Sequence, residues 1–397
     1  MIKELAARVQ RIKPSPTMAV SARAEELIMA GKDIISLSVG EPDFDTPDFI
    51  KEAAIKAIRD GMTKYTAVDG TIGLKRAIIN KFERDNQLKY QPNQILVSCG
   101  AKHSLYNLFA ALLNPGDEVI IPAPYWVSYP DMVKLMDGEP VFVNADIHQH
   151  FKITPAELES AMTPRTKLVI LNSPSNPTGV AYTKEELAAL GTVLLKHPNV
   201  VVVTDDIYEH TLWHGTFSNI VMACPALYDR TVVVNGVSKA YAMTGWRIGY
   251  AAGPANLIAA MKKIQSQSTS NPTSIAQAAS EAALNGDQSC IALMTRAYKE
   301  RHDYILAAFQ KIPGIKVQAS DGTFYSFPSF AGVIEKSPRV NDDIELAEYL
   351  LTEAGIAIIP GSAFGAPGYL RLSYATRMEK VKDAMQRIKM AVENLLK

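Results

Sequence analysis

Short apolar runs alternate with helical stretches from residue 94 to residue 252, and this alternation restricts the possible folds most. The runs are 94–99, 118–122, 140–144, 167–172, 200–205, 231–235 and 247–252, and helical stretches between them include 101–113, 126–136 and 183–195. Strands that are buried on both faces are continuously apolar, and parallel strands need crossover connections. The pattern therefore predicts an α/β domain whose mostly parallel, seven-stranded sheet is covered by helices.

The segments on either side of this repeat predict an arm and a second, smaller α+β domain. Helical periodicity covers residues 1–13, ending at Pro14 and Pro16, and then 22–30, before an apolar strand at 34–39. A helical region at 255–311 is broken near Asn271 and Asn285, and the remainder alternates strands at 323–328, 355–359 and 368–374 with helices at 342–354 and 377–396. We expect an arm and part of the small domain at 1–47, the large domain at 48–285 and the small domain at 286–397.

Composition excludes several classes of partner. The 397 residues carry 41 Lys plus Arg and 41 Asp plus Glu, so no overall field favours nucleic acid or an anionic membrane. Cys99, Cys224 and Cys290 are widely separated and lack the spacing of a metal site, as expected in a reducing compartment. Neither a signal peptide nor a membrane span is predicted. We expect a cytoplasmic protein that binds a small molecule and no metal.

Lys239 is the strongest candidate for covalent chemistry. It lies just after the apolar run 231–235, and Arg247 follows eight residues later in the stretch 235–249. Burial or a neighbouring cation lowers the pKa of a lysine enough for its neutral amine to attack a carbonyl. Small residues such as Ser238 leave room for a flat ligand. The alternative is a solvated lysine after a strand, and the stretch alone favours that alternative.

Two groups after earlier strands could bind other parts of such a ligand. Gly100, Ala101 and Lys102 open a helix after the run 94–99, where backbone amides could hold a phosphate. Trp126 follows the run 118–122, where its indole could stack on an aromatic ring. The alternatives are an ordinary strand-to-helix turn and a core tryptophan.

Polar residues also follow the next two strands. Asn176 lies in the proline-containing segment 172–179, where its amide could contact a ligand oxygen, although many such turns bind nothing. Asp205 ends the run 200–205, and a carboxylate buried there would need a charged partner such as a protonated ring nitrogen. Tyr208 would lie on the same side if the chain turns helically. Otherwise Asp205 is a helix N-cap.

Arg371 lies inside the apolar strand 368–374 of the small domain. A guanidinium is costly there unless it meets an anion, and its planar donors fit a carboxylate. An arginine on an edge strand facing water is the alternative.

Taken together, these segments resemble the class I aminotransferases of pyridoxal-phosphate fold type I, close to the prokaryotic aspartate aminotransferases. The resemblance covers nearly the whole chain and rests on seven segments in the order and spacing of the family: SVGEPDFDTP, TKY, PYWVSYP, NSPSNPTG, DDIYEH, SKAYAMTGWRIG and RLSYAT. It implies pyridoxal 5'-phosphate as cofactor, bound by the large domain.

The resemblance also assigns roles to individual residues. Lys239 would form the Schiff base with the cofactor and later move the substrate's α-proton. Asp205 would pair with the pyridine nitrogen, while Tyr208 and Asn176 would hydrogen-bond the phenolic oxygen. The remaining contacts are implied as follows: Trp126 for the ring face and the substrate; Gly100, Ala101, Lys102, Ser238, Arg247 and Tyr65 of a neighbouring subunit for the phosphate end; and Arg371 with Gly40 and Asn176 for the substrate's α-carboxylate.

Two positions depart from the pattern of many relatives. Gly236 stands where they carry a serine that contacts the phosphate, so Ser238 or another residue would replace that contact. No arginine stands near Ser266, where other branches bind the distal carboxylate of the substrate. In the branch that this chain resembles, Lys102 is implied to bind that carboxylate, together with polar groups near Ser15 and Thr17. Lys13 belongs to the same neighbourhood and matters for relatives that accept prephenate.

The resemblance implies ping-pong transamination between L-aspartate and 2-oxoglutarate by a homodimer with shared active sites. An aminotransferase for prephenate or aromatic amino acids is the first alternative. A pyridoxal-phosphate lyase is a second. A regulatory, non-enzymatic relative is a third, and the presence of the full set Lys239, Asp205, Tyr208, Arg247 and Arg371 argues against it.

Overall fold

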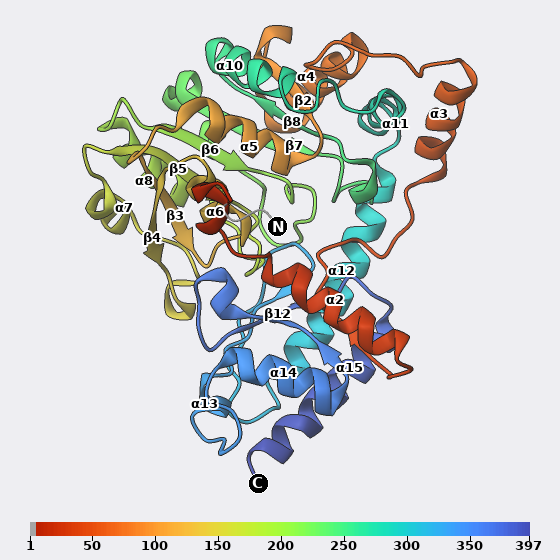
Figure 1. The fold of residues 1–397 in the computed structure, drawn as a ribbon, viewed down its shortest axis with the longest axis vertical. Helices are drawn as coiled ribbons and strands as arrows, with labels where there is room; N and C mark the ends of the chain where they lie inside the picture. The colour runs from red at the N-terminus through yellow and green to blue at the C-terminus, as the bar shows by residue number, and fades with distance from the viewer. Residues whose placement is uncertain (1–4) are drawn as a thin grey trace.

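The central sheet of the computed structural model, which describes residues 5–397, has seven strands in the order β2-β8-β7-β6-β5-β3-β4 (Figure 1). The strands are β2 (Ile95–Ser98), β3 (Glu118–Ala123), β4 (Glu139–Asn144), β5 (Thr166–Asn172), β6 (Val201–Asp205), β7 (Thr231–Gly236) and β8 (Gly249–Ala252). All seven predicted strands are present, and the predicted α/β fold is confirmed.

The strand directions bring the candidate residues to one edge of the sheet. Strands β3 to β7 are mutually parallel where they pair, whereas β8 runs antiparallel to both of its neighbours, β2 and β7. The amino end of β8 therefore lies at the edge where the other strands have their carboxyl ends. Arg247, two residues before β8, thus lies at the same edge as the segments that follow β2, β3, β5, β6 and β7, and it contacts Cys99 after β2.

Helices cover both faces of the sheet because successive residues of each strand point to opposite sides. Ile95 and Val97 belong to one hydrophobic cluster, and Leu96 between them belongs to the other. The first cluster packs on α3 (Asp48–Arg59), α4 (Ile72–Asn86), α7 (Pro155–Ala161), α8 (Lys184–Leu195), α9 (Ile220–Ala223) and α11 (Ser274–Asn285). The second packs on α5 (Ala101–Leu112), α6 (Ser128–Leu135) and α10 (Ala255–Ser266).

A second body of the fold is built around its own hydrophobic cluster, at the lower end of Figure 1. Its strands are β1 (Ile35–Ser36) with β10 (Ile356–Ala357), and β12 (Leu370–Ser373) between β11 (Ile359–Pro360) and β9 (Tyr325–Ser326). Its helices are α13 (Ala331–Ile334), α14 (Asp343–Ala354), α15 (Met378–Leu395) and most of α12 (Ser289–Phe309). The predicted smaller α+β unit is present, and the helical region 255–311 is interrupted at the two predicted places.

The N-terminal arm differs from its prediction. Residues 1–4 of the predicted helix 1–13 lie outside the described residues, and the remainder forms only α1 (Ala7–Gln10). Pro16 does not end a helix; it occupies the first turn of α2 (Pro16–Met29), because a proline there loses no helical hydrogen bond. The predicted strand 34–39 forms a regular strand only over β1. Within residues 5–397, no helix is both long and apolar enough to cross a bilayer.

Candidate active site

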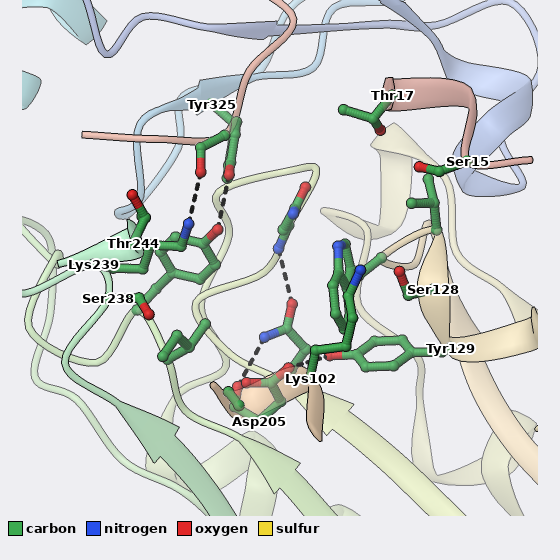
Figure 2. A pocket seen from close by; sticks show the side chains of 18 of the residues that line it. Ser15, Thr17, Lys102, Ser128, Tyr129, Asp205, Ser238, Lys239, Thr244 and Tyr325 are labelled. Atoms are coloured by element: carbon green, nitrogen blue, oxygen red, sulfur yellow. Dashed lines mark hydrogen bonds between the residues drawn. The ribbon is translucent and has the colours of Figure 1, made fainter. Parts of the chain in front are cut away.

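A cavity of about 390 Å³ opens at the strand edge that carries Lys239 (Figure 2). Its walls come from the sheet, from the small-domain strands β9 and β12, and from the N-terminal arm. The cavity brings together most of the residues singled out from the sequence: Ser15, Thr17, Gly40, Ala101, Lys102, Trp126, Asn176, Asp205, Tyr208, Ser238, Lys239, Arg247 and Arg371.

Lys239 points into this cavity from the loop that follows β7, so it is not a solvated lysine (Figure 2). Its Nζ donates a hydrogen bond of 2.6 Å to the carbonyl oxygen of Gly40. Burial lowers the pKa of Lys239 to about 8, against the opposing charge of Glu41. Arg371 lowers this pKa as well, ahead of Arg247, the cation that the sequence had suggested. A usable share of the amine is therefore neutral near physiological pH.

Asp205 is buried at the cavity floor, with 4% of its surface exposed. Its Oδ2 accepts a hydrogen bond of 2.7 Å from the hydroxyl of Tyr129, while Oδ1 has no partner among the described residues. Burial raises the pKa of Asp205 to about 6, and the Tyr129 hydrogen bond opposes this increase. No helix begins at Asp205, so the N-cap alternative is wrong. Residues 5–397 therefore leave one oxygen of a buried carboxylate without a donor.

Arg371 is 2% exposed and lies on β12, the middle strand of its sheet, so the alternative of an edge-strand arginine in water is wrong. Its two terminal nitrogens donate to Asn176 Oδ1 at 3.1 Å and to the Ser38 carbonyl at 2.5 Å. Its Nε has no partner, and the guanidinium stacks 4.7 Å from the centre of the Tyr325 ring. Within residues 5–397 no carboxylate forms an ion pair with Arg371, which leaves a buried cation facing the cavity.

Asn172, Asn176 and Tyr208 are held in place by further hydrogen bonds. The Asn172 side chain accepts from the Asn176 amide at 2.9 Å and donates to the Asp205 carbonyl at 2.8 Å. Tyr208, in the turn after β6, shares a hydrogen bond of 2.8 Å with the hydroxyl of Tyr325. The end of β5 is thereby fixed to the end of β6, and the turn after β6 is fixed to β9.

The amino end of α5 and the guanidinium of Arg247 form an anion-binding corner. Gly100 precedes the helix with φ of 91°, and a Cβ there would lie 2.3 Å from Nη2 of Arg247. A Cβ on Gly249 would lie 2.1 Å from the backbone nitrogen of Ala101. Both glycines are therefore needed for this close approach, which places helix amides and a guanidinium side by side, with Ser238 also lining the cavity.

The outer wall of the cavity combines Trp126 with polar groups. Lys102 Nζ lies 4.9 Å from the centre of the Trp126 ring, a cation–π distance. Burial, followed by the charge of Arg247, lowers the pKa of Lys102. Ser15 and Thr17 reach the cavity from the start of α2. This wall therefore offers a cation and two hydroxyls at a distance from Lys239.

Some predicted residues do not line the cavity. Tyr65 is 91% exposed and is not among its lining residues, and neither is Gly100, which packs against the guanidinium of Arg247. Gly236 ends β7, where a Cβ would lie 3.0 Å from the Ile248 carbonyl. Ser266 instead donates to the carbonyl of Lys263 within α10, and Lys13 is likewise outside the lining. Conversely, sequence reasoning missed Asn172, Ser128, Tyr129, Thr244 and Tyr325, all of which line the cavity.

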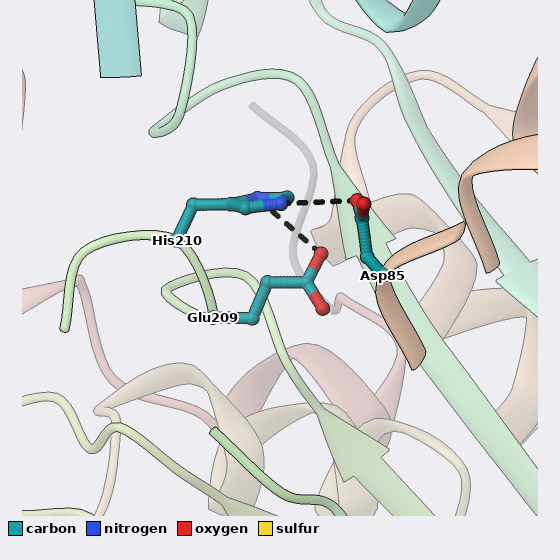
Figure 3. A group of neighbouring side chains, drawn as sticks. All are labelled: Asp85, Glu209 and His210. Atoms are coloured by element: carbon teal, nitrogen blue, oxygen red, sulfur yellow. Dashed lines mark hydrogen bonds and ion pairs between the residues drawn. The ribbon is translucent and has the colours of Figure 1, made fainter. Parts of the chain in front are cut away.

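A second cluster of titratable side chains joins α4 to the turn after β6: Asp85, Glu209 and His210 (Figure 3). The His210 ring lies 3.2 Å from the Asp85 carboxylate and 3.4 Å from that of Glu209. Buried Lys81 pairs with Glu209, and Arg84 pairs with Asp85. Both carboxylates thus have cationic partners within the chain, and the cluster anchors the residue that follows Tyr208.

Comparisons with known proteins agree with this geometry. The family model "Aminotransferase class I and II" matches residues 32–388. An aspartate/prephenate aminotransferase of Nitrosomonas europaea is 56% identical over 97% of this chain and 98% of its own. The aspartate aminotransferase structure of Rhizobium meliloti has a TM-score of 0.96 at 47% identity, covering 99% of both chains. The Thermus thermophilus aspartate aminotransferase with maleate has a TM-score of 0.93 at 42% identity, covering 98% of this chain and all of its own.

The lowered pKa of Lys239 predicts a pH-dependent effect of Lys239→Met on the cofactor-free protein. Between about pH 8 and 10.5, folded Lys239 loses its proton while the unfolded chain keeps it, so wild-type stability gains as the pH rises. The variant lacks this gain. Below pH 8 the variant should be more stable than wild type, because wild type buries a charged amine there. We expect this difference in the free energy of unfolding to shrink between pH 8 and 10.5 by an amount on the order of 2–3 kcal/mol.

Urea denaturation at several pH values measures this difference. Lys56→Met is the control, because Lys56 forms an ion pair at the surface and its side chain is 75% exposed. A difference between Lys239→Met and wild type that stays constant from pH 7 to 10 would contradict the assignment.

Proposed function

The chain belongs to the class I and II aminotransferases, and we propose that it transfers the amino group of L-aspartate to 2-oxoglutarate, giving oxaloacetate and L-glutamate. The observation that carries the proposal is the content of one cavity: the amine of Lys239, the free Oδ1 of Asp205, and the buried guanidinium of Arg371. The amine would react with an aldehyde, the carboxylate would pair with a basic ring nitrogen, and the guanidinium would bind a substrate carboxylate.

Pyridoxal phosphate is the cofactor of this family, and the residues present fit it. Asp205 Oδ1 is a buried acceptor that a protonated pyridine nitrogen would satisfy. The corner formed by the α5 amides, Ser238 and Arg247 would hold the phosphate. When bound, the cofactor supplies an aldehyde that takes up the amino group and a ring that delocalises the electron pair left by the departing α-proton.

The chain's own residues would contribute orientation and proton transfer. Neutral Nζ of Lys239 is the base for the α-proton of the substrate, in keeping with its lowered pKa. Tyr208 and Asn176 would donate to the phenolic oxygen of the cofactor, and Trp126 would cover the ring face. Arg371 would bind the substrate's α-carboxylate through Nε and a terminal nitrogen, beside Gly40 and Asn176.

A half-reaction tests this proposal. With aspartate alone, the cofactor-loaded enzyme should release about one oxaloacetate per site and stop, because the amino group stays on the enzyme until 2-oxoglutarate arrives. Lys239→Ala should retain cofactor but release none. Oxaloacetate is measured by coupled reduction, and free ammonia is measured in parallel. Continuous product or ammonia release from aspartate alone would indicate a lyase, and full activity of Lys239→Ala would refute the role of the lysine.

Prephenate is a second candidate substrate, because the relative from Nitrosomonas europaea is named for both aspartate and prephenate. The proposed reader of the distal carboxylate is Lys102, with Ser15 and Thr17. All three line the cavity, whereas Ser266, on α10, does not. The Thermus thermophilus relative, whose structure holds the dicarboxylate maleate, is consistent with such a reader.

Lys102→Met should separate substrates with and without a second carboxylate. We expect kcat/KM for aspartate to fall about 10- to 100-fold, because a charge-assisted hydrogen bond is lost. The value for phenylalanine, which has no distal carboxylate, should stay unchanged. Steady-state kinetics with aspartate, prephenate and phenylalanine measure this pattern, and an equal loss for all three would assign Lys102 to the cofactor instead.

We propose a homodimer in which Tyr65 completes the site of its partner, since Tyr65 is exposed and does not line the cavity of its own chain. Mixed dimers of Lys239→Ala and Tyr65→Ala subunits test this arrangement. One of the two sites then has both residues intact, so we expect half of wild-type activity with wild-type cofactor affinity. A fully active monomer in sedimentation, or a mixed dimer that binds cofactor as weakly as Tyr65→Ala, would refute it.

A further inference from the structure

The two oxygens of the Asp205 carboxylate have different surroundings. Oδ2 accepts from the Tyr129 hydroxyl at 2.7 Å, whereas Oδ1 has no partner among the described residues (Figure 2). Because the Tyr129 bond occupies one side of the carboxylate, rotation about the Cβ–Cγ bond would break it. Asp205 lines the cavity, and the Tyr129 bond therefore fixes the orientation of Oδ1, the oxygen that has no partner.

Tyr129 itself has little freedom to move. It lies in the first turn of α6, is 2% exposed, and packs among Leu96, Leu105 and their neighbours in the hydrophobic cluster on that face of the sheet. Its ring meets that of Trp126 edge to face, with centroids 5.2 Å apart. Burial raises the pKa of Tyr129 well above its ordinary value, so the hydroxyl keeps its proton and acts as a donor.

A fixed donor on Oδ2 favours the ionised carboxylate. The charged or titratable groups near Asp205 are Tyr129 on α6, Lys239 after β7, and Asp206 and Tyr208 in its own segment. Tyr129, then the backbone N–H of Ile207 and Lys239, favour the anion against the burial that raises the pKa of Asp205. We therefore expect loss of the Tyr129 hydroxyl to raise the pKa of Asp205.

We propose that Tyr129 is a positioning residue, which fixes Asp205 with Oδ1 toward the ring nitrogen of the cofactor and keeps the carboxylate anionic. This inference rests on the proposed function, since the ring nitrogen belongs to the bound cofactor. Residues 126–129 would then act on the cofactor ring in two ways. The indole of Trp126 would cover its face, and the hydroxyl of Tyr129 would orient Asp205.

Tyr129→Phe removes only the hydroxyl, and Tyr182→Phe is a matched control. Tyr182 is also buried, and its hydroxyl accepts a backbone hydrogen bond from Ile153 outside the cavity. We expect Tyr129→Phe to lower kcat for aspartate about 10-fold or more, with a smaller change in KM. We also expect the dissociation constant of the cofactor to increase. Tyr182→Phe should change stability without these effects.

Two further measurements distinguish positioning from a structural role. In the cofactor-free protein, carboxyl carbon NMR should show Asp205 titrating at a higher pH in Tyr129→Phe than in wild type or Tyr182→Phe. In the Asp205→Asn background, Tyr129→Phe should cause little further loss of cofactor affinity. An unshifted Asp205 titration, or wild-type kcat and cofactor affinity in Tyr129→Phe, would overturn the inference.

The NMR titration uses the protein without cofactor, so it reports on Tyr129 independently of turnover. If wild type itself released no oxaloacetate from aspartate, the proposed function would fail while the titration would still decide whether Tyr129 controls Asp205.

Discussion

The site depends on burying two cations, Lys239 and Arg371, in one cavity without a carboxylate partner from the described chain. Such burial is unfavourable for each charge and for the pair. For Lys239 the cost favours the neutral amine, which is the form that reacts with a carbonyl. For Arg371, which keeps its charge, hydrogen bonds to Asn176 and Ser38 offset part of the cost, and a bound anion would offset more of it. The same unfavourable term thus favours a neutral amine at Lys239 and the binding of an anion at Arg371, in keeping with their proposed roles.

Rigid surroundings keep these groups from relaxing toward other partners. At the end of β6 and in the turn that follows, Asp205 and Tyr208 line the cavity. The residues directly after them, Asp206 and Glu209, are buried and contact Asn219 and Lys81 respectively. Asn172 ties β6 to the turn that carries Asn176. Asp205 and Tyr208 are therefore each followed by a residue that buried polar contacts hold in place.

Much of this arrangement could be predicted because parallel sheets collect functional groups at their strand ends. The strand-end positions of Lys239, Asp205 and Asn176 follow from the apolar runs, and Arg371 stands out as a charge within an apolar strand. Tyr129 and Tyr325 could not be found in this way, since a tyrosine in an apolar stretch looks like a core residue until its hydroxyl partner is known. The start of α2 at Pro16 was missed because a proline both ends and begins helices.

The most direct test is a crystal structure of the chain with pyridoxal phosphate and maleate, a dicarboxylate that has no amino group to transfer. We expect Asp205 Oδ1 within hydrogen-bond distance of the ring nitrogen, and one carboxylate of maleate on Arg371 with the other toward Lys102. A structure in which maleate binds elsewhere and the Arg371 guanidinium contacts only Asn176 and Ser38 would contradict the assignment of the buried cation to the substrate.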